Sequence, residues 1–214
     1  MPVKVFTALV VVDVQNDFME GGALAVPNAS EIIDPINRMA PTFERVIVTQ
    51  DWHPEDHVSF AASHEGKNVG DKIQLPYGEQ MLWPVHCVEG TRGADLAPGL
   101  RLPMSRVIAI LKGNHKDVDS YSGLLEADRK THTGFHAYCE DRFVNRLYIC
   151  GLATDFCVMW TALDAIHLGY EVYLVTDATR GIDVNGSLEA AMDHMKMAGV
   201  KMVTAEEVIN REIK

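Results

Sequence analysis

The sequence has no long hydrophobic run. Its apolar stretches are strand-sized, well short of the roughly 18 apolar residues that a membrane-spanning helix requires. In the first segment, MPVKVFTALVVV, the apolar run before the charged residue Asp13 is too short for a signal peptide. The segment has the pattern of a first strand instead. We therefore expect no membrane partner and a cytoplasmic location.

Basic residues are also scarce. The chain has 19 Lys and Arg against 30 Asp and Glu, which gives a net charge of −11. A surface with this balance repels phosphate backbones and anionic lipid headgroups. The composition excludes nucleic acid as a partner and favours a small molecule; a homo-oligomer stays open.

Cysteine is sparse, and no two cysteines form a C-x-x-C pair. In a chain of this length that spacing indicates free thiols in a reducing compartment and excludes a disulfide framework. One of the thiols could be chemically reactive. The four positions are Cys87, Cys139, Cys150 and Cys157.

With 47% hydrophobic residues, the chain can bury a full core, and its length predicts one domain, residues 1–214. Within this domain, short apolar segments alternate with helical patterns. This alternation predicts an α/β fold: a doubly wound, mostly parallel six-stranded sheet with helices on both faces, a Rossmann-like three-layer arrangement. The stretch 51–99 has no clear period, and we expect a long functional loop there. The expected strands are 7–14, 45–50, 106–112, 147–152, 171–176 and 200–204, and the expected helices 30–43, 119–129, 157–168, 187–198 and 205–211.

Charged or reactive residues stand at the ends of several predicted strands. In such sheets ligands bind beyond the carboxyl ends of the strands, so Asp13, Asp51, Lys112 and Cys157 should share one rim. Cys157 begins a predicted helix, where the helix dipole favours a thiolate; Asp13 is the leading base and Lys112 a stabilising cation. Taken singly, the three also fit a capping carboxylate, a solvent-exposed lysine and a buried apolar thiol.

A second group has the residue types of a metal site. Asp51 and His53, with His57 and His86 further along, offer a carboxylate and imidazoles, which suit zinc, iron or manganese. Three protein ligands would leave coordination positions open for water or substrate. The alternative is that these histidines are ordinary structural or surface residues.

The turn before Cys157 has two interpretations. The backbone amides of Ala153 and Cys157 could form an oxyanion hole, or Thr154 and Asp155 could simply cap the following helix. Large aromatic residues in polar loops, Phe18, Trp83 and Tyr121, are candidates for substrate contacts or for loop anchors.

Taken in order, these motifs resemble the cysteine amidohydrolases of the isochorismatase-like fold, and among them the nicotinamidase/pyrazinamidase group. The resemblance covers nearly the whole chain. It is carried by DVQNDF at 13–18, TQDWHP at 49–54, LWPVHC at 82–87, KG at 112–113, DSYSG at 119–123 and GLATDFCV at 151–158.

The resemblance implies hydrolysis of nicotinamide to nicotinate and ammonia, and of pyrazinamide to pyrazinoate, through a thioester on Cys157. It implies one divalent metal ion, zinc first with iron or manganese as alternatives, and a cis peptide between Leu152 and Ala153. The implied roles are a catalytic triad of Asp13, Lys112 and Cys157; an oxyanion hole of Ala153 and Cys157; metal ligands Asp51, His53 and His86 with His57 as a fourth in some members; and substrate contacts from Phe18, Trp83, Tyr121 and Phe156.

Phe156 and Leu124 differ from the residues usual in the family, which bears on fine substrate preference. Two other readings of the sequence stay open. One is a related hydrolase of another small amide or ureido compound. The other is a non-enzymatic binding module, which the intact set of Asp13, Lys112 and Cys157 disfavours.

Overall fold

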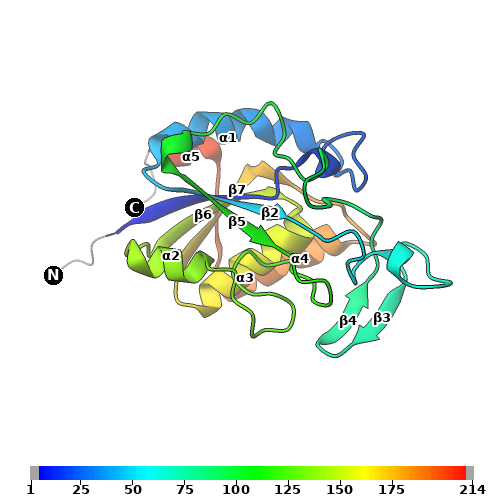
Figure 1. The fold of residues 1–214 in the computed structure, drawn as a ribbon. Helices are drawn as coiled ribbons and strands as arrows, with labels where there is room; N and C mark the ends of the chain where they lie inside the picture. The colour runs from blue at the N-terminus through cyan, green and yellow to red at the C-terminus, as the bar shows by residue number, and fades with distance from the viewer. Residues whose placement is uncertain (1–4, 211–214) are drawn as a thin grey trace.

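The computed structural model describes residues 5–210 and is built around one six-stranded parallel sheet (Figure 1). The strand order is β5-β2-β1-β6-β7-β8, and every pair is parallel. The expected fold class is confirmed. The strands are β1 Thr7–Val12, β2 Val46–Asp51, β5 Val107–Lys112, β6 Arg146–Leu152, β7 Glu171–Arg180 and β8 Lys201–Val203.

Helices cover both faces of this sheet (Figure 1). Helices α1 (Ile33–Met39) and α5 (Ala205–Ile209) lie on one face, and α2 (Phe135–Asp141), α3 (Met159–His167) and α4 (Ser187–Ala198) lie on the other. Among residues 5–210, no helix combines the length and apolar character needed to cross a bilayer.

Strand β1 shows why a central strand reads as a continuous apolar run. Leu9 and Val11 join the core under α1, while Ala8, Val10 and Val12 join the core under α3 and α4. All five side chains are fully buried. A strand with helices on both sides has no polar face, so its sequence does not alternate.

Three parts of the fold depart from the sequence-based expectations. The helix predicted over 119–129 is wrong: Asp128 accepts hydrogen bonds from the amides of Lys130 and Thr131, and this local pairing holds the segment in turns. Helix α2 was not predicted. Neither was the antiparallel hairpin of β3 (Lys72–Leu75) and β4 (Gly78–Met81) inside the long loop.

The other elements match their predicted bounds to within a few residues; the helix predicted over 30–43 is α-helical over Ile33–Met39, with a 3-10 turn on each side. Three other bounds also shift. The helix expected from residue 157 begins earlier, as a π-helical turn over Thr154–Val158, and β7 continues to Arg180 after a register shift against β6. The helix predicted for 205–211 ends at Ile209, and its residue 211 lies outside the described part of the chain.

Strand β6 needs a glycine where it passes closest to β1. Gly151 pairs with Val12 and has a φ of 109°, a conformation that residues with a Cβ rarely adopt. A Cβ at this position would lie 2.1 Å from the Val12 carbonyl oxygen. The two strands can therefore reach their shared carboxyl end only if residue 151 has no side chain.

We expect Gly151→Ala to lower the free energy of unfolding by at least about 3 kcal/mol, because backbone strain and a backbone clash act together. Gly199→Ala is the matched control: its φ is 95°, but the space around it is open, so it should cost only about 1 kcal/mol. Urea unfolding of both variants measures the difference. Equal losses would mean that the approach to Val12 does not constrain the strand.

Candidate active site

The carboxyl ends of β1, β2 and β5 meet around a fully buried lysine, Lys112. Its Nζ lies 2.9 Å from Asp13 Oδ2, 3.5 Å from Cys157 Sγ, and in direct ion-pair contact with Asp51 Oδ1. It also donates to the Ser120 carbonyl at 2.8 Å. The structure thus places the four predicted rim residues together, and Lys112 is not a solvent-exposed lysine.

Asp13 is held on two sides. Thr49 Oγ1 donates to its Oδ1 at 2.6 Å, and Lys112 pairs with its Oδ2. A carboxylate oxygen of Asp13 lies within 4.8 Å of Cys157 Sγ. Burial raises the pKa of Asp13 to about 6, although the positive charge of Lys112 opposes the shift.

The Cys157 thiol is less acidic than its helix position suggests. Only 6% of the residue is exposed, and burial raises the pKa of the thiol well above its ordinary value, while Lys112 works in the opposite direction. In the free protein, burial therefore outweighs the groups that favour a thiolate. A thiol in this state requires a nearby proton acceptor before it can act as a nucleophile.

Beside Lys112, a carboxylate oxygen and two imidazole nitrogens converge. Asp51 Oδ2 lies 3.7 Å from His53 Nε2 and 3.8 Å from His86 Nε2. The other ring nitrogens point at backbone carbonyls: His53 Nδ1 lies 2.7 Å from Gly113 O and His86 Nδ1 2.8 Å from Pro84 O. Because carbonyls only accept, each Nδ1 carries a hydrogen, and in the neutral ring the Nε2 atom therefore has the free lone pair.

The ionisation states also suit a cation. Burial works to raise the pKa of Asp51, but the charges of Lys112 and His53 outweigh it and hold the carboxyl ionised. Burial lowers the pKa of His86 to about 4, so this imidazole is neutral near pH 7. Burial works to lower the pKa of His53, but the charge of Asp51 raises it, so a bound metal ion would displace the proton from His53 Nε2. An ionised carboxylate and two imidazole Nε2 atoms then fit a divalent metal ion.

His57 lies beside this group and has a different environment. Its ring stacks on His53 at 4.2 Å. Its Nε2 donates to the Val118 carbonyl at 3.2 Å, and its Nδ1 lies 2.7 Å from the Ser59 hydroxyl. Both ring nitrogens are thus occupied by the protein, and His57 is grouped with His53 and Asp119, away from Asp51 and His86.

A small cavity opens above the thiol, and all four predicted substrate-contact residues line it. Phe156 meets Trp83 edge to face, with ring centroids 5.0 Å apart, and Trp83 Nε1 donates to the Tyr121 hydroxyl at 2.9 Å. Phe18 packs beside His86 at 5.6 Å. The same cavity is lined by Asp51, His53, His86, Ala153 and Cys157.

Several residues of the site were missed in the sequence. Asp119 and Ser120 line the cavity and stood in the DSYSG motif beside Tyr121, so their position was the available signal. Gln15, adjacent in the DVQNDF motif, both donates to and accepts from the Asp51 backbone at 2.8 Å. Thr49 stood in the TQDWHP motif and had the same signal, whereas Ile182 had none. Leu124, expected near the pocket wall, is buried in the core instead.

The turn before Cys157 is fixed by side chains that do not cap their own helix. Asp155 accepts hydrogen bonds from the amides of Ile182 and Asp183 and from the Ser187 hydroxyl, which ties the turn to the start of α4. Thr154 pairs with the hydroxyl of Thr179 at 2.7 Å. The helix-cap interpretation of Thr154 and Asp155 is therefore wrong. The peptide between Leu152 and Ala153 is cis, as the resemblance implied.

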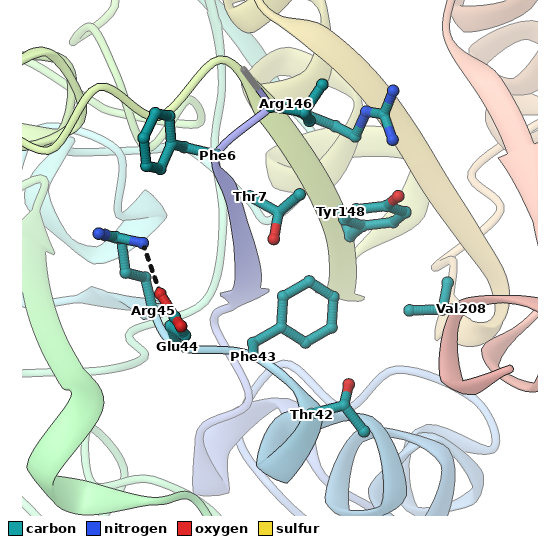
Figure 2. Close-up of a pocket in the computed structure, with 10 residues that line it drawn as sticks. Phe6, Thr7, Thr42, Phe43, Glu44, Arg45, Arg146, Tyr148 and Val208 are labelled. Atoms are coloured by element: carbon teal, nitrogen blue, oxygen red, sulfur yellow. Dashed lines mark hydrogen bonds and ion pairs between the residues drawn. The ribbon is translucent and has the colours of Figure 1, made fainter. Parts of the chain in front are cut away.

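A second hollow lies at the opposite, amino-terminal end of the sheet (Figure 2). Aromatic side chains of Phe6, Phe43 and Tyr148 surround it, and its charged residues include an ion pair between Glu44 and Arg45. It contains neither a thiol nor a histidine. The chemistry of the molecule is concentrated at the carboxyl ends of the strands.

Comparison with known proteins agrees with this geometry. Residues 7–207 match the model of the isochorismatase domain family. The chain belongs to the isochorismatase family. It is 50% identical to a nicotinamidase of Acinetobacter baylyi over 202 residues, which cover 94% of each chain. The extent of the single domain over residues 1–214 stays a prediction, because residues 1–4 and 211–214 lie outside the described part.

Solved structures of similar proteins share the fold over nearly their whole length. A nicotinamidase/pyrazinamidase of Acinetobacter baumanii is 48% identical with a TM-score of 0.93, covering 96% of this chain and 99% of that one. A pyrazinamidase of Pyrococcus horikoshii, in complex with zinc, is 38% identical with a TM-score of 0.77, covering 92% and 98%.

The Asp13 carboxyl should titrate near pH 6 in the protein without added metal. The Thr49 hydroxyl stabilises the charged form, so Thr49→Val should raise the Asp13 pKa by roughly one pH unit. Thr161→Val, which removes another buried hydroxyl, is the control and should leave that pKa unchanged. Carbon-13 NMR titration of labelled aspartate measures it. An Asp13 that titrates near pH 4 in the wild type would contradict the assigned environment.

Proposed function

We propose that this protein is a metal-dependent cysteine amidohydrolase that converts nicotinamide to nicotinate and ammonia, and pyrazinamide to pyrazinoate. The observation that carries the proposal is the Cys157 thiol, which lines the cavity while its sulfur lies 3.5 Å from a lysine paired with Asp13. The nicotinamidase relatives reported above support the choice of substrate.

The first step uses the buried pair. Asp13 accepts the thiol proton of Cys157, and Lys112 stabilises the resulting thiolate, whose formation burial otherwise opposes. The sulfur attacks the carboxamide carbon, forming a C–S bond as the carbonyl π electrons move to oxygen. The backbone amides of Ala153 and Cys157, at the rim of the cavity, would stabilise that oxyanion.

The second half returns the protein to its starting state. When the oxyanion collapses, the C–N bond breaks and Asp13 gives its proton to the nitrogen, which leaves as ammonia. A thioester on Cys157 remains. Asp13 then accepts a proton from water, whose oxygen attacks the thioester carbon. The C–S bond breaks, Asp13 returns its proton to the Cys157 sulfur, and the acid leaves as nicotinate after it gives up its own proton to solvent.

Asp51, His53 and His86 would hold the metal ion, for which zinc is the first candidate and iron or manganese are alternatives. When bound, the metal would supply a coordination position for the ring nitrogen of the substrate and so orient the ring. The aromatic residues Phe18 and Trp83 would then flank that ring, with Tyr121 and Phe156 completing the wall. This arrangement would position the amide carbon against the sulfur.

Ammonia release from a panel of compounds tests the proposal. Nicotinamide and pyrazinamide should be hydrolysed with equal amounts of ammonia and carboxylate formed, whereas a ureido compound of similar size should not. Cys157→Ala should remove turnover by at least about 10⁴-fold and still bind nicotinamide. Cys139→Ala, another buried free thiol, is the matched control and should stay active.

A panel in which only the ureido compound is hydrolysed would favour the related-hydrolase alternative. Ammonia release that persists in the Cys157→Ala variant would overturn the covalent mechanism. Wild-type protein that binds the amides and hydrolyses none would favour a binding module.

The metal ligands are tested by zinc affinity without any assay of activity. His53→Ala should weaken zinc binding by at least about 100-fold, because it removes an Nε2 that faces Asp51. His57→Ala, whose ring stacks on the same histidine, should weaken it by less than about 10-fold. Competition with a chelating dye measures both, and equal losses would make His57 a ligand.

We also propose that the protein acts in the cytoplasm on this small molecule, a location that agrees with four cysteines that are all free.

A further inference from the structure

The β3–β4 hairpin contains one side chain that does not fit an exposed ribbon. Every residue of its two strands is exposed or half-buried except Gln80, of which 2% is exposed. The hairpin lies beyond the carboxyl ends of β2 and β5, on the side of the candidate active site (Figure 1). A buried amide needs hydrogen-bond partners, and their identity shows what the hairpin docks against.

The Gln80 amide is fully engaged. Its Nε2 donates to Asp119 Oδ2 at 2.7 Å and to the Met81 carbonyl at 2.7 Å, and its Oε1 accepts from the Tyr77 hydroxyl at 3.1 Å. The same Nε2 lies 3.4 Å from the Tyr121 hydroxyl oxygen. Gln80 therefore joins the hairpin to the segment 119–121, all three residues of which line the cavity.

The Tyr121 hydroxyl is the centre of this network. It accepts from Trp83 Nε1 at 2.9 Å, and Gln80 Nε2 approaches it from the hairpin. Trp83 Nε1 can only donate, so the phenol oxygen accepts from it. The two hydrogens of Gln80 Nε2 serve Asp119 and Met81 at 2.7 Å, and its 3.4 Å approach to the phenol oxygen is a longer, secondary contact that packs Gln80 against Tyr121. Gln80 is not itself among the residues that line the cavity above the thiol, whereas Trp83, Tyr121 and Asp119 are.

We propose that Gln80 is a positioning residue for the substrate: from behind the cavity wall it fixes Tyr121 and Asp119, and through Tyr121 it fixes Trp83, so that the wall accepts a flat aromatic ring. This inference rests on the proposed function and deepens it. None of the hydrogen-bond partners of Gln80 is the thiol or one of the proposed metal ligands. The loss of Gln80 should therefore affect binding of the ring more than the chemical step.

The test compares two identical substitutions on the same hairpin. Gln80→Leu removes the amide with little change in volume, and its KM for nicotinamide should rise about 10-fold with kcat within about 3-fold. Gln74→Leu is the matched control, since Gln74 is exposed and its amide reaches only the neighbouring Leu75 carbonyl. Its KM and kcat should equal those of the wild type.

A double-mutant cycle tests whether Gln80 acts through Tyr121. Tyr121→Phe alone should raise KM, and adding Gln80→Leu should raise it by less than about 3-fold more, because both changes break one network. Fully multiplicative effects would overturn the proposed route. So would a KM in Gln80→Leu equal to that of the wild type, or a loss confined to kcat.

If Gln80→Leu does not fold, Tyr77→Phe tests the same network, because it leaves Gln80 in place and removes the hydroxyl that donates to Gln80 and accepts from the Asp119 amide at 3.3 Å. It should raise KM about 2- to 3-fold with kcat unchanged; no change would overturn the inference. Thermal unfolding of each variant monitors folding. If the wild-type protein hydrolyses no aromatic amide, the proposed function itself is overturned. If the wild type is active and Gln80→Leu has the same KM and kcat, only the positioning role of Gln80 is overturned.

Discussion

The candidate active site depends on one buried ammonium group. Lys112 Nζ lies between Asp13 and Asp51 with no exposed surface, so its charge is stabilised by these carboxylates and by hydrogen bonds to the Ser120 carbonyl and the Cys157 sulfur. Removing one partner of such a buried ion pair commonly costs about 3–5 kcal/mol, because the other charge is left without compensation. Three neighbouring strands supply the members of this cluster, and their parallel register brings the side chains together.

The same lysine joins the two chemical halves of the site. On one side it lies beside the Cys157 sulfur and Asp13; on the other it holds Asp51 Oδ1, so that Oδ2 faces His53 and His86. The thiol and the candidate metal group therefore cannot be positioned independently. Burial raises the pKa of both Asp13 and Cys157: it makes the Asp13 carboxylate a stronger proton acceptor than an ordinary carboxylate, and it makes the Cys157 thiol a weaker acid.

Much of this arrangement was predictable from the sequence, because the residues concerned lie at the carboxyl ends of predicted strands. Asp13, Asp51 and Lys112 each close an apolar run, and parallel strands deliver their carboxyl ends to one edge. What the sequence did not show depends on contacts between distant segments. The Thr49 hydroxyl, on β2, donates to Asp13 at the end of the neighbouring strand β1. Gln80 is buried because the hairpin packs against the segment around Asp119.

The predicted helix over 119–129 failed for a similar reason. Its sequence has helix-forming residues, but the Asp128 carboxylate accepts hydrogen bonds from nearby backbone amides, and these bonds stabilise turns. In this irregular conformation the segment contributes Asp119 and Tyr121 to the cavity. His57 shows the limit of residue type as a signal. It has the chemistry of a metal ligand, and both of its ring nitrogens are hydrogen-bonded to protein atoms, so its place as a fourth ligand stays a prediction.

The central claim is that Cys157 is the nucleophile and becomes acylated during turnover. The most direct measurement is mass spectrometry of the protein quenched with acid within milliseconds of mixing with nicotinamide, followed by digestion. The account predicts a transient increase equal to one nicotinoyl group on the peptide that contains Cys157, formed before nicotinate reaches its steady rate. Nicotinate formed at full rate with no adduct at any time, or with the adduct on Cys87, Cys139 or Cys150, would contradict it.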